Sequence, residues 1–269
     1  MKETMDYTGE RMVPEQAEAD TFWEHIYRYR FAAQFVAGKR VLDIACGEGY
    51  GAAALSQSGA QDIIGVDVSA EACEHAARRY GIEARLGDAQ NIPLPNGAVD
   101  TVVSFETIEH ISHPEKFLDE CVRVLQPGGR LIISTPNRNA YLKDAPQNPY
   151  HLKELTEAEF IGLLAARFRN LQIYTQRPAA AGWWSLRLLA SASALWEVRG
   201  FRRLRWLLQK KICPETVDLK KLEQARINPI QAILNHPDGW AHLANPFAIR
   251  PRSKFAREIP IYVIAVATL

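Results

Sequence analysis

Short runs rich in β-branched residues alternate with helical stretches from Lys39 onward, and this alternation constrains the fold most strongly. The runs at 41–45, 63–68 and 100–105 are each followed by a segment of helical composition. This rhythm is typical of βαβ units, in which parallel strands form a sheet with helices on both faces. We therefore expect an α/β protein with a doubly wound sheet.

The rest of the chain departs from this rhythm. Residues 15–37 predict one amphipathic N-terminal helix, and the run at 259–269 is so uniformly apolar that we place it inside the sheet. Residues 177–257 show no clear βα pattern and are expected to form a helical insertion before the last strand. The expected division is a cap segment (1–38), a main domain (39–176 and 258–269) and an inserted lid or substrate region (177–257).

Composition excludes several classes of protein. Lys and Arg number 32 against 31 Asp and Glu, so a surface built wholly for nucleic acid is not expected. The hydrophobic content of 47% argues against a disordered chain. Four scattered cysteines without a CxxC motif, and no apolar leader in the first ten residues, predict a reduced, cytoplasmic protein. Its oligomeric state stays open.

The segment VLDIACGEGYGAA places Gly47, Gly49 and Gly51 between a predicted strand and a predicted helix. Glycines there allow a tight turn and bring backbone N–H groups close to a ligand. Gly47-x-Gly49-x-x-Ala52 satisfies the degenerate dinucleotide pattern, and Asp67 ends the next strand, where an acid binds the two hydroxyls of a ribose. By themselves, these residues indicate no more than a cofactor that contains adenosine.

Asp43 favours a cofactor with a sulfonium cation over a dinucleotide, and Asp88 adds a third acid at the same sheet edge. Asp43 lies four residues before Gly47, where a carboxylate would repel a pyrophosphate but attract a ligand with an amino acid and a sulfonium cation. Asp88 follows the third strand, where it can accept the adenine amino group or, alternatively, form a turn. Three acids at successive strand ends, in step with the glycines, predict a cofactor site.

Five motifs follow in order along residues 39–176: VLDIACGEGYG, IIGVDVS, GDAQNIPLP, DTVVSFETIEHI and RVLQPGGRLIISTP. Together they resemble class I S-adenosylmethionine-dependent methyltransferases. The resemblance implies a Rossmann-like, seven-stranded sheet of order 3-2-1-4-5-7-6 with strand 7 antiparallel. Ala45 stands where the family usually has glycine, a small change that we do not take as loss of binding. The predicted cofactor residues in these motifs are Asp43, Ala45, Gly47, Gly49, Asp67, Val68, Asp88, Ala89 and Phe105.

The flanking segments TGERMVPE, EHIYRY, STPNRNAY and NPYHLKEL are similar to bacterial methyltransferases of cell-surface polysaccharide and O-antigen gene clusters. Tyr7 and Arg28 belong to these flanks and complete the predicted cofactor site. Arg28 is expected to pair with the cofactor's methionine carboxylate through its bidentate guanidinium. The alternative is a surface arginine on an amphipathic helix.

Methyl transfer to a sugar hydroxyl calls for a general base, because the pKa of such a hydroxyl is high. The candidates are Glu106, Glu109 and His110 after the fourth strand and His151 after the fifth. The alternative for His110 is a packed histidine, and for His151 a loop hydrogen bond or a helix cap. An anionic acceptor needs no base, and these residues would then only position it.

A metal site is not expected. His110-x-x-His113 has the spacing of metal ligands, but Ser112, His113 and Pro114 are more typical of a helix start.

The insertion contains a strongly basic stretch, since residues 187–211 hold seven Arg and Lys against one acid.

Four tryptophans (183, 184, 196 and 206) are interleaved with leucines in and beside that stretch. Residues 183–211 can therefore lie on an anionic membrane at the inner face or hold an anionic glycan, sugar nucleotide or RNA. The alternative is a lid helix whose arginines are merely solvated.

The sequence as a whole predicts a methyltransferase that uses S-adenosylmethionine, releases S-adenosylhomocysteine and O-methylates a sugar or phosphosugar of a surface glycan or its precursor. Transfer is an in-line displacement. A second interpretation is an O-methyltransferase for a small molecule of the quinone or phenol type. Alternatives of another class are an NAD-binding oxidoreductase and a non-catalytic scaffold. The partner is then a glycan or small-molecule acceptor, with nucleic acid unfavoured.

Overall fold

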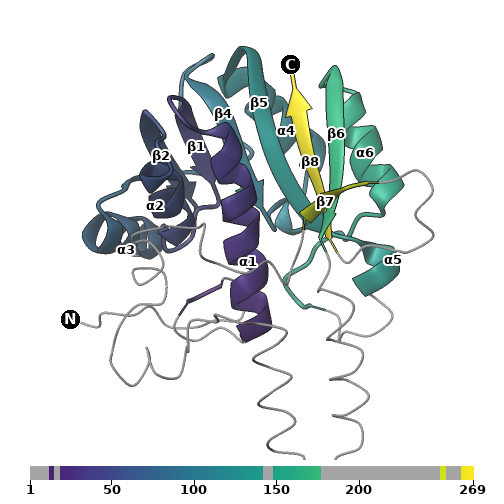
Figure 1. Cartoon of the computed structure of the whole chain (residues 1–269), viewed down its shortest axis with the longest axis horizontal. Coiled ribbons are helices and arrows are strands. Elements are labelled where there is room, and N and C mark those ends of the chain that lie inside the picture. Colours follow the sequence, from purple (N-terminus) through teal and green to yellow (C-terminus); the bar gives the residue numbers. More distant parts are fainter. Residues whose placement is uncertain (1–11, 15–18, 142–147, 177–248, 253–261) are drawn as a thin grey trace, which may run out of the picture. The chain divides into compact units, whose positions relative to one another are not determined.

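The computed structural model describes residues 12–14, 19–141, 148–176, 249–252 and 262–269 (Figure 1). Their central element is one sheet whose strands follow the order β3-β2-β1-β4-β5-β8-β6-β7. The strands are β1 (Arg40–Ile44), β2 (Asp62–Asp67), β3 (Glu83–Leu86), β4 (Val99–Phe105), β5 (Leu125–Pro136), β6 (Asn170–Gln176), β7 (Ile249–Pro251) and β8 (Tyr262–Thr268).

The sheet is mixed. Strands β3, β2, β1, β4 and β5 run parallel to one another, as expected from the βα rhythm. The terminal strand β8 lies antiparallel between β5 and β6, and its residues 263–267 are buried. Its uniformly apolar sequence therefore reflects its position inside the sheet.

The expected number of seven strands is wrong, because the described part of the chain contains eight. The additional strand β7 pairs antiparallel with β6, with Thr175 opposite Arg250. It lies within 177–257, the region predicted to be a helical insertion, so residues 249–251 belong to the sheet instead. A strand of three residues is too short for a visible period of two, and its proline is tolerated because β7 is at the edge.

Helices lie on both faces of the sheet, with α1 crossing in front of the strands and α4 seen behind them (Figure 1). The predicted N-terminal helix is shorter than expected, because α1 ends at Ala32 and a 3-10 turn follows. Within the described residues, no helix has the length and hydrophobicity that crossing a membrane requires. The helices are α1 (Ala19–Ala32), α2 (Tyr50–Gln57), α3 (Ala70–Tyr80), α4 (Pro114–Val124), α5 (Arg138–Tyr141) and α6 (Glu157–Ala165), with 3-10 turns η1 (Ala33–Phe35) and η2 (Ile108–His110).

Local sequence explains where several helices begin. The Ser69 hydroxyl accepts a hydrogen bond from the Ala72 N–H at the start of α3, as an N-cap serine does. Helix α4 begins with Pro114, and His113 occupies the position before it. The expected helix start at Ser112-His113-Pro114 is therefore confirmed.

The core on the α4 face contains apolar side chains from the sheet and from α4. Phe117, Leu118 and Cys121 of α4 are fully buried against strand residues that include Leu42 and Val102. Cys46, Cys73 and Cys121 are free thiols and buried. Burial of this apolar surface is the main force that holds helix and sheet together.

Substitution of Phe117 by alanine should lower the free energy of unfolding by about 3–5 kcal/mol, because it leaves a cavity in this core. Urea denaturation measures the change. The exposed neighbour Lys116 provides a matched control, and Lys116→Ala should change stability by no more than about 0.5 kcal/mol. Equal losses for the two variants would contradict the described orientation of α4.

Candidate active site

The loop after β1 turns sharply into α2 at the carboxyl edge of the sheet. Ala45, Gly47 and Gly49 have positive φ angles of 59°, 54° and 87°. A Cβ atom at Gly49 would lie 2.5 Å from the Cβ of Ala76 in α3, so glycine is required there for space and for its backbone conformation. A Cβ atom at Gly47 would meet no atom within 4 Å, so open space lies beside this backbone.

Asp67 connects the ends of β1 and β2. Its Oδ2 accepts a hydrogen bond from the Gly47 N–H at 2.8 Å, and its Oδ1 accepts one from the Ser69 N–H at 2.9 Å. Each carboxylate oxygen can accept a second bond, so the side chain can still receive the hydroxyls of a ribose. The next residue, Val68, is 75% exposed and offers an apolar surface at the same edge.

Asp43 is buried beneath a tyrosine of α1. The Tyr29 hydroxyl lies 3.2 Å from both carboxylate oxygens of Asp43. Burial, with a smaller contribution from the charge of Asp67, raises the pKa of Asp43 to about 8. At neutral pH this carboxyl is therefore mostly protonated, and an approaching cation would favour its ionised form.

Tyr29 is a site residue that the sequence did not single out within the predicted amphipathic helix of residues 15–37. A Cβ atom at Gly51 would lie 1.9 Å from the Tyr29 Cζ, so the third glycine of the loop makes room for this ring. Tyr29 also packs edge-to-face on Phe105, at 5.1 Å between ring centroids. Phe105 is buried, and its predicted contact with the cofactor stays a prediction.

Asp88 and Ala89 follow β3. Asp88 is exposed, and its Oδ1 accepts a hydrogen bond from the Gln90 N–H at 2.8 Å. The turn that was the alternative interpretation is therefore present, and the predicted contact of Asp88 with adenine stays a prediction. Ala89 is buried beside it.

Arg28 and Glu106 lie together behind the site. Arg28 is fully buried, so the alternative of a surface arginine is wrong. Its Nη1 donates to the Gln176 side chain at 3.0 Å and lies 4.0 Å from Glu106, and its guanidinium stacks on the Tyr262 ring. Among the described residues, Nε and Nη2 have no hydrogen-bond acceptor. These donors suit an anion such as the predicted carboxylate.

Glu106 is held in a strained conformation directly after β4. Its φ is 52°. Among the described residues, Ala45 and Glu106 are the two non-glycine residues with positive φ. Its Oε1 accepts a hydrogen bond from the Ser134 hydroxyl at 2.7 Å. Strain of this kind is maintained only where surrounding contacts impose it, and it clusters at functional sites.

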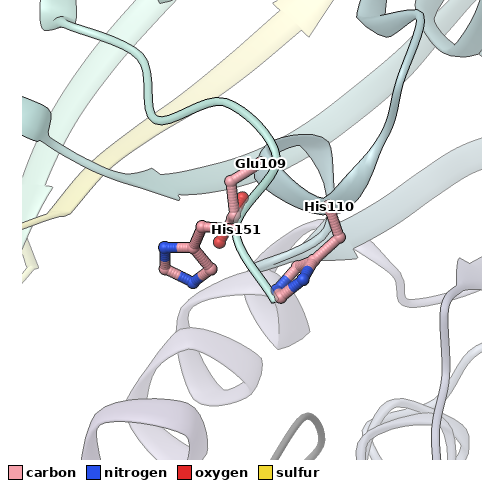
Figure 2. Close-up of side chains that lie close together, drawn as sticks. All are labelled: Glu109, His110 and His151. Carbon is pink, nitrogen blue, oxygen red and sulfur yellow. The ribbon is translucent and has the colours of Figure 1, made fainter. Parts of the chain in front are cut away.

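Glu109, His110 and His151 come together from two segments (Figure 2). The backbone N–H groups of Leu152 and Lys153 donate to the Glu109 carbonyl at 2.9 and 3.1 Å, which holds the loop after β5 against η2. The two imidazole rings lie 4.9 Å apart, edge to face. Their proximity could not be derived from the sequence, because 40 residues separate them.

Each histidine is oriented by a neighbour. The His110 Nδ1 lies 2.9 Å from the Tyr150 carbonyl, which can only accept, so this nitrogen carries the proton and Nε2 carries the lone pair. For His151, Nδ1 lies 3.0 Å from Glu154 and Nε2 lies 3.1 Å from the Asn148 side-chain nitrogen. The loop hydrogen bonds considered for His151 are therefore present.

Tyr7 lies outside the described residues, as do residues 183–211.

The residues that are described fit an adenosine cofactor with a cationic centre. They provide open space beside Gly47, oxygen acceptors at Asp67, an exposed apolar side chain at Val68 and a buried carboxyl at Asp43. A pyrophosphate would fit poorly, because Asp43 and Asp67 both place acidic groups at this edge.

Comparisons with known proteins agree with this geometry. Residues 42–133 match the family model of a methyltransferase domain. A probable S-adenosylmethionine-dependent methyltransferase from Mycolicibacterium smegmatis is 41% identical over 162 residues, which cover 58% of this chain and 62% of the relative. Residues 42–133 are thus similar to a methyltransferase domain, and the chain spans about three fifths of the length of this relative. Such domains use S-adenosylmethionine as cofactor.

Two further similarities are more limited. A ubiquinone biosynthesis O-methyltransferase from Psychrobacter arcticus is 36% identical over 39% of this chain and 43% of its own length. The structure of an S-adenosylmethionine-dependent methyltransferase from Thermotoga maritima superposes with a TM-score of 0.57 over 91% of this chain and 89% of its own, at 17% identity. At that identity the likeness concerns the fold alone.

The methyltransferase domain match runs from β1 to β5 and includes Asp43, Asp67, Asp88 and Glu106. Arg28 and His151 lie outside it. Their positions depend on α1 and on the loop after β5, which lie outside the matched residues.

The buried carboxyl of Asp43 should make the protein less stable as the pH rises from about 4 to about 8. In that interval the folded protein retains a proton that the unfolded chain, with a pKa near 3.8, has released, so raising the pH favours unfolding. Above about pH 8 both states are ionised and this contribution is constant. Urea unfolding at about pH 5, 7 and 9 measures it.

Asp43→Asn is the matched comparison, because it keeps the shape and cannot titrate. Its stability should change less with pH than that of the wild type. Burial also raises the pKa of Glu109, but Glu109 is present in both proteins. An identical pH dependence in both would contradict the shifted pKa of Asp43.

Proposed function

We propose that this protein transfers the methyl group of S-adenosylmethionine to a hydroxyl oxygen of a sugar or phosphosugar. The observation that carries the proposal is the convergence of Asp43, Gly47 and Asp67 at one sheet edge, beside the strained Glu106. Ligands bind at this place in open α/β sheets, outside the carboxyl ends of the strands. The bound cofactor supplies a methyl group activated on a sulfonium.

The residues around the glycine loop hold the cofactor. Asp67 accepts hydrogen bonds from the ribose hydroxyls while it keeps Gly47 in place. Asp43 provides the negative charge that the cationic amino acid end attracts, and Arg28 binds the carboxylate of that end. Because Arg28 and Asp43 are both buried, these charges act in a medium where they are poorly screened by water.

The acceptor side is formed by Glu106, His110 and His151. We assign proton removal to the Nε2 of His110, because the Tyr150 carbonyl fixes the proton on Nδ1. His151 positions the His110 ring, and its own nitrogens are held by Asn148 and Glu154. Glu106, whose Oε1 lies 4.0 Å from the Arg28 Nη1, positions the acceptor hydroxyl.

A quinone or phenol acceptor is the second candidate. Tyr150 and Leu152, on the loop that carries His151, are 38% and 65% exposed, and apolar side chains of this kind suit a flat aromatic ring. The name of the Psychrobacter arcticus relative is consistent with this acceptor class. For either acceptor we propose that residues 1–38 form a cap and that the part of 177–257 before β7 forms the substrate region.

The site of action follows from the acceptor. We place the protein in the cytoplasm, with residues 183–211 in contact with the anionic inner face of the membrane where lipid-linked glycans are assembled. Loss of liposome binding on combined substitution of Arg202, Arg203 and Arg205 is the expected result of a co-sedimentation test. Unchanged sedimentation would remove the membrane from the proposal.

S-adenosylmethionine and S-adenosylhomocysteine should each raise the melting temperature, and NAD should not. A ligand at about 100 times its Kd stabilises the folded state by about 2.7 kcal/mol, which corresponds to several degrees. Asp67→Ala should remove this shift. Asp62→Ala, at the exposed opposite end of β2, should keep it. A shift with NAD alone would overturn the assigned cofactor.

His110→Ala should lower kcat about 100- to 10,000-fold while the thermal shift with S-adenosylhomocysteine persists. Transfer of a tritiated methyl group to panels of oligosaccharides, sugar phosphates and catechols measures the rate and identifies the acceptor class. His113→Ala, three residues away and exposed, is the control with unchanged kcat. Transfer to catechols alone would establish the second candidate in place of the first.

A further inference from the structure

The cluster of Glu109, His110 and His151 has the composition of a metal site as well as that of a proton relay. Each residue offers one ligand atom, and the three atoms lie within 4.8 Å of one another. Figure 2 shows the Glu109 carboxyl between the two imidazoles. Two ligand atoms of a tetrahedral ion, bound at about 2.0–2.2 Å, are about 3.5 Å apart, so side-chain movements of about 1 Å would bring the three atoms to ligation distance.

The Glu109 carboxyl is a buried polar group with one oxygen left without a hydrogen bond among the described residues. It is fully buried, and its Oε2 accepts a hydrogen bond from the Thr135 hydroxyl at 3.2 Å. Its Oε1 has no hydrogen-bond partner among the described residues. A buried oxygen without a partner is costly, and a cation bound to it would remove that cost.

The histidines already have the outer hydrogen bonds that orient metal ligands. The His110 Nδ1–H donates to a backbone carbonyl and the His151 Nδ1–H donates to the Glu154 carboxylate, so Nε2 carries the lone pair in both rings. Ligating imidazoles characteristically donate their other nitrogen in this way. The Asn148 amide, which now donates to the His151 Nε2, would have to give way to the ion.

We propose that Glu109, His110 and His151 bind one divalent transition-metal ion of the class of Zn²⁺, Co²⁺ or Mn²⁺. Two imidazoles and one carboxylate favour these ions over Mg²⁺ and Ca²⁺, which prefer oxygen ligands alone. This assignment replaces the expectation that the chain has no metal site. It also differs from the His110-x-x-His113 pair, because His113 precedes α4 and is not in the cluster.

The ion would serve the acceptor. A three-residue site leaves coordination positions open, and a hydroxyl oxygen bound there would have a lowered pKa. The histidines would then act as ligands, and the hydroxyl proton would pass to water instead of to His110 while the methyl group leaves the sulfonium for the bound oxygen. This part of the inference rests on the proposed methyl transfer, whereas ion binding does not.

Titration of the full chain, stripped with EDTA, against CoCl₂ and ZnCl₂ tests the site. We expect one ion per chain by calorimetry and visible absorption bands of bound Co²⁺. Glu109→Gln, His110→Ala and His151→Ala should each weaken binding at least about tenfold, as should Glu154→Ala, which removes the outer hydrogen-bond acceptor of His151. His113→Ala should bind as the wild type does.

Two measurements keep the result interpretable. The thermal shift with S-adenosylhomocysteine verifies that each variant is folded, and X-ray absorption on the wild type with bound Zn²⁺ counts imidazole ligands without any variant. No stoichiometric binding by the wild type, or no imidazole in the ligand shell, would overturn the proposal. Equal affinity in Glu109→Gln and His113→Ala would do so as well.

The two proposals fail in different ways. Stoichiometric ion binding without methyl transfer to any acceptor supports the metal site and contradicts the proposed function. Methyl transfer at full rate in the EDTA-stripped protein supports the function and contradicts a role of the ion toward the acceptor. Methyl transfer that is lost in EDTA and restored by Zn²⁺, Co²⁺ or Mn²⁺ supports both.

Discussion

The reversal of strand order between β1 and β4 is the constraint on which the site depends. The chain first builds outward from β1 to β3 and then returns to add β4 and β5 on the other side. The loops after β1 and β4 therefore diverge, and a ligand can enter between them. Ala45 and Glu106, the described non-glycine residues with positive φ, directly follow these two strands. Backbone strain is thus concentrated where the fold opens.

Burial of charged groups beneath α1 determines the electrostatics of that opening. Tyr29 covers Asp43, and Arg28 lies close to Glu106. Because water is excluded from these contacts, Asp43 holds its proton up to about pH 8, whereas the Arg28 guanidinium remains charged beside a carboxylate. A cationic ligand group and an anionic one would each find an opposite partner within one small volume.

Much of this arrangement could be predicted from local patterns. The βα rhythm predicted the parallel strands, because burial imposes residue types at short range. The glycine loop and its acids belong to the same category, since close backbone approach needs glycine. The antiparallel terminal strand was implied by the resemblance to class I methyltransferases. Strand β7 was missed, because three residues carry no periodicity, and the end of α1 was placed too far along the chain.

The sequence by itself determined the class of fold, the cofactor loop and the acids at the strand ends, because each depends on residues that are neighbours in the chain. Only the tertiary structure decided that Arg28 is buried beside Glu106, that Tyr29 fills the space left by Gly51, and that His151 meets Glu109 and His110. These contacts join segments far apart in the sequence. Their partners are selected by packing of α1 and of the loop after β5 on the sheet, which no local pattern records.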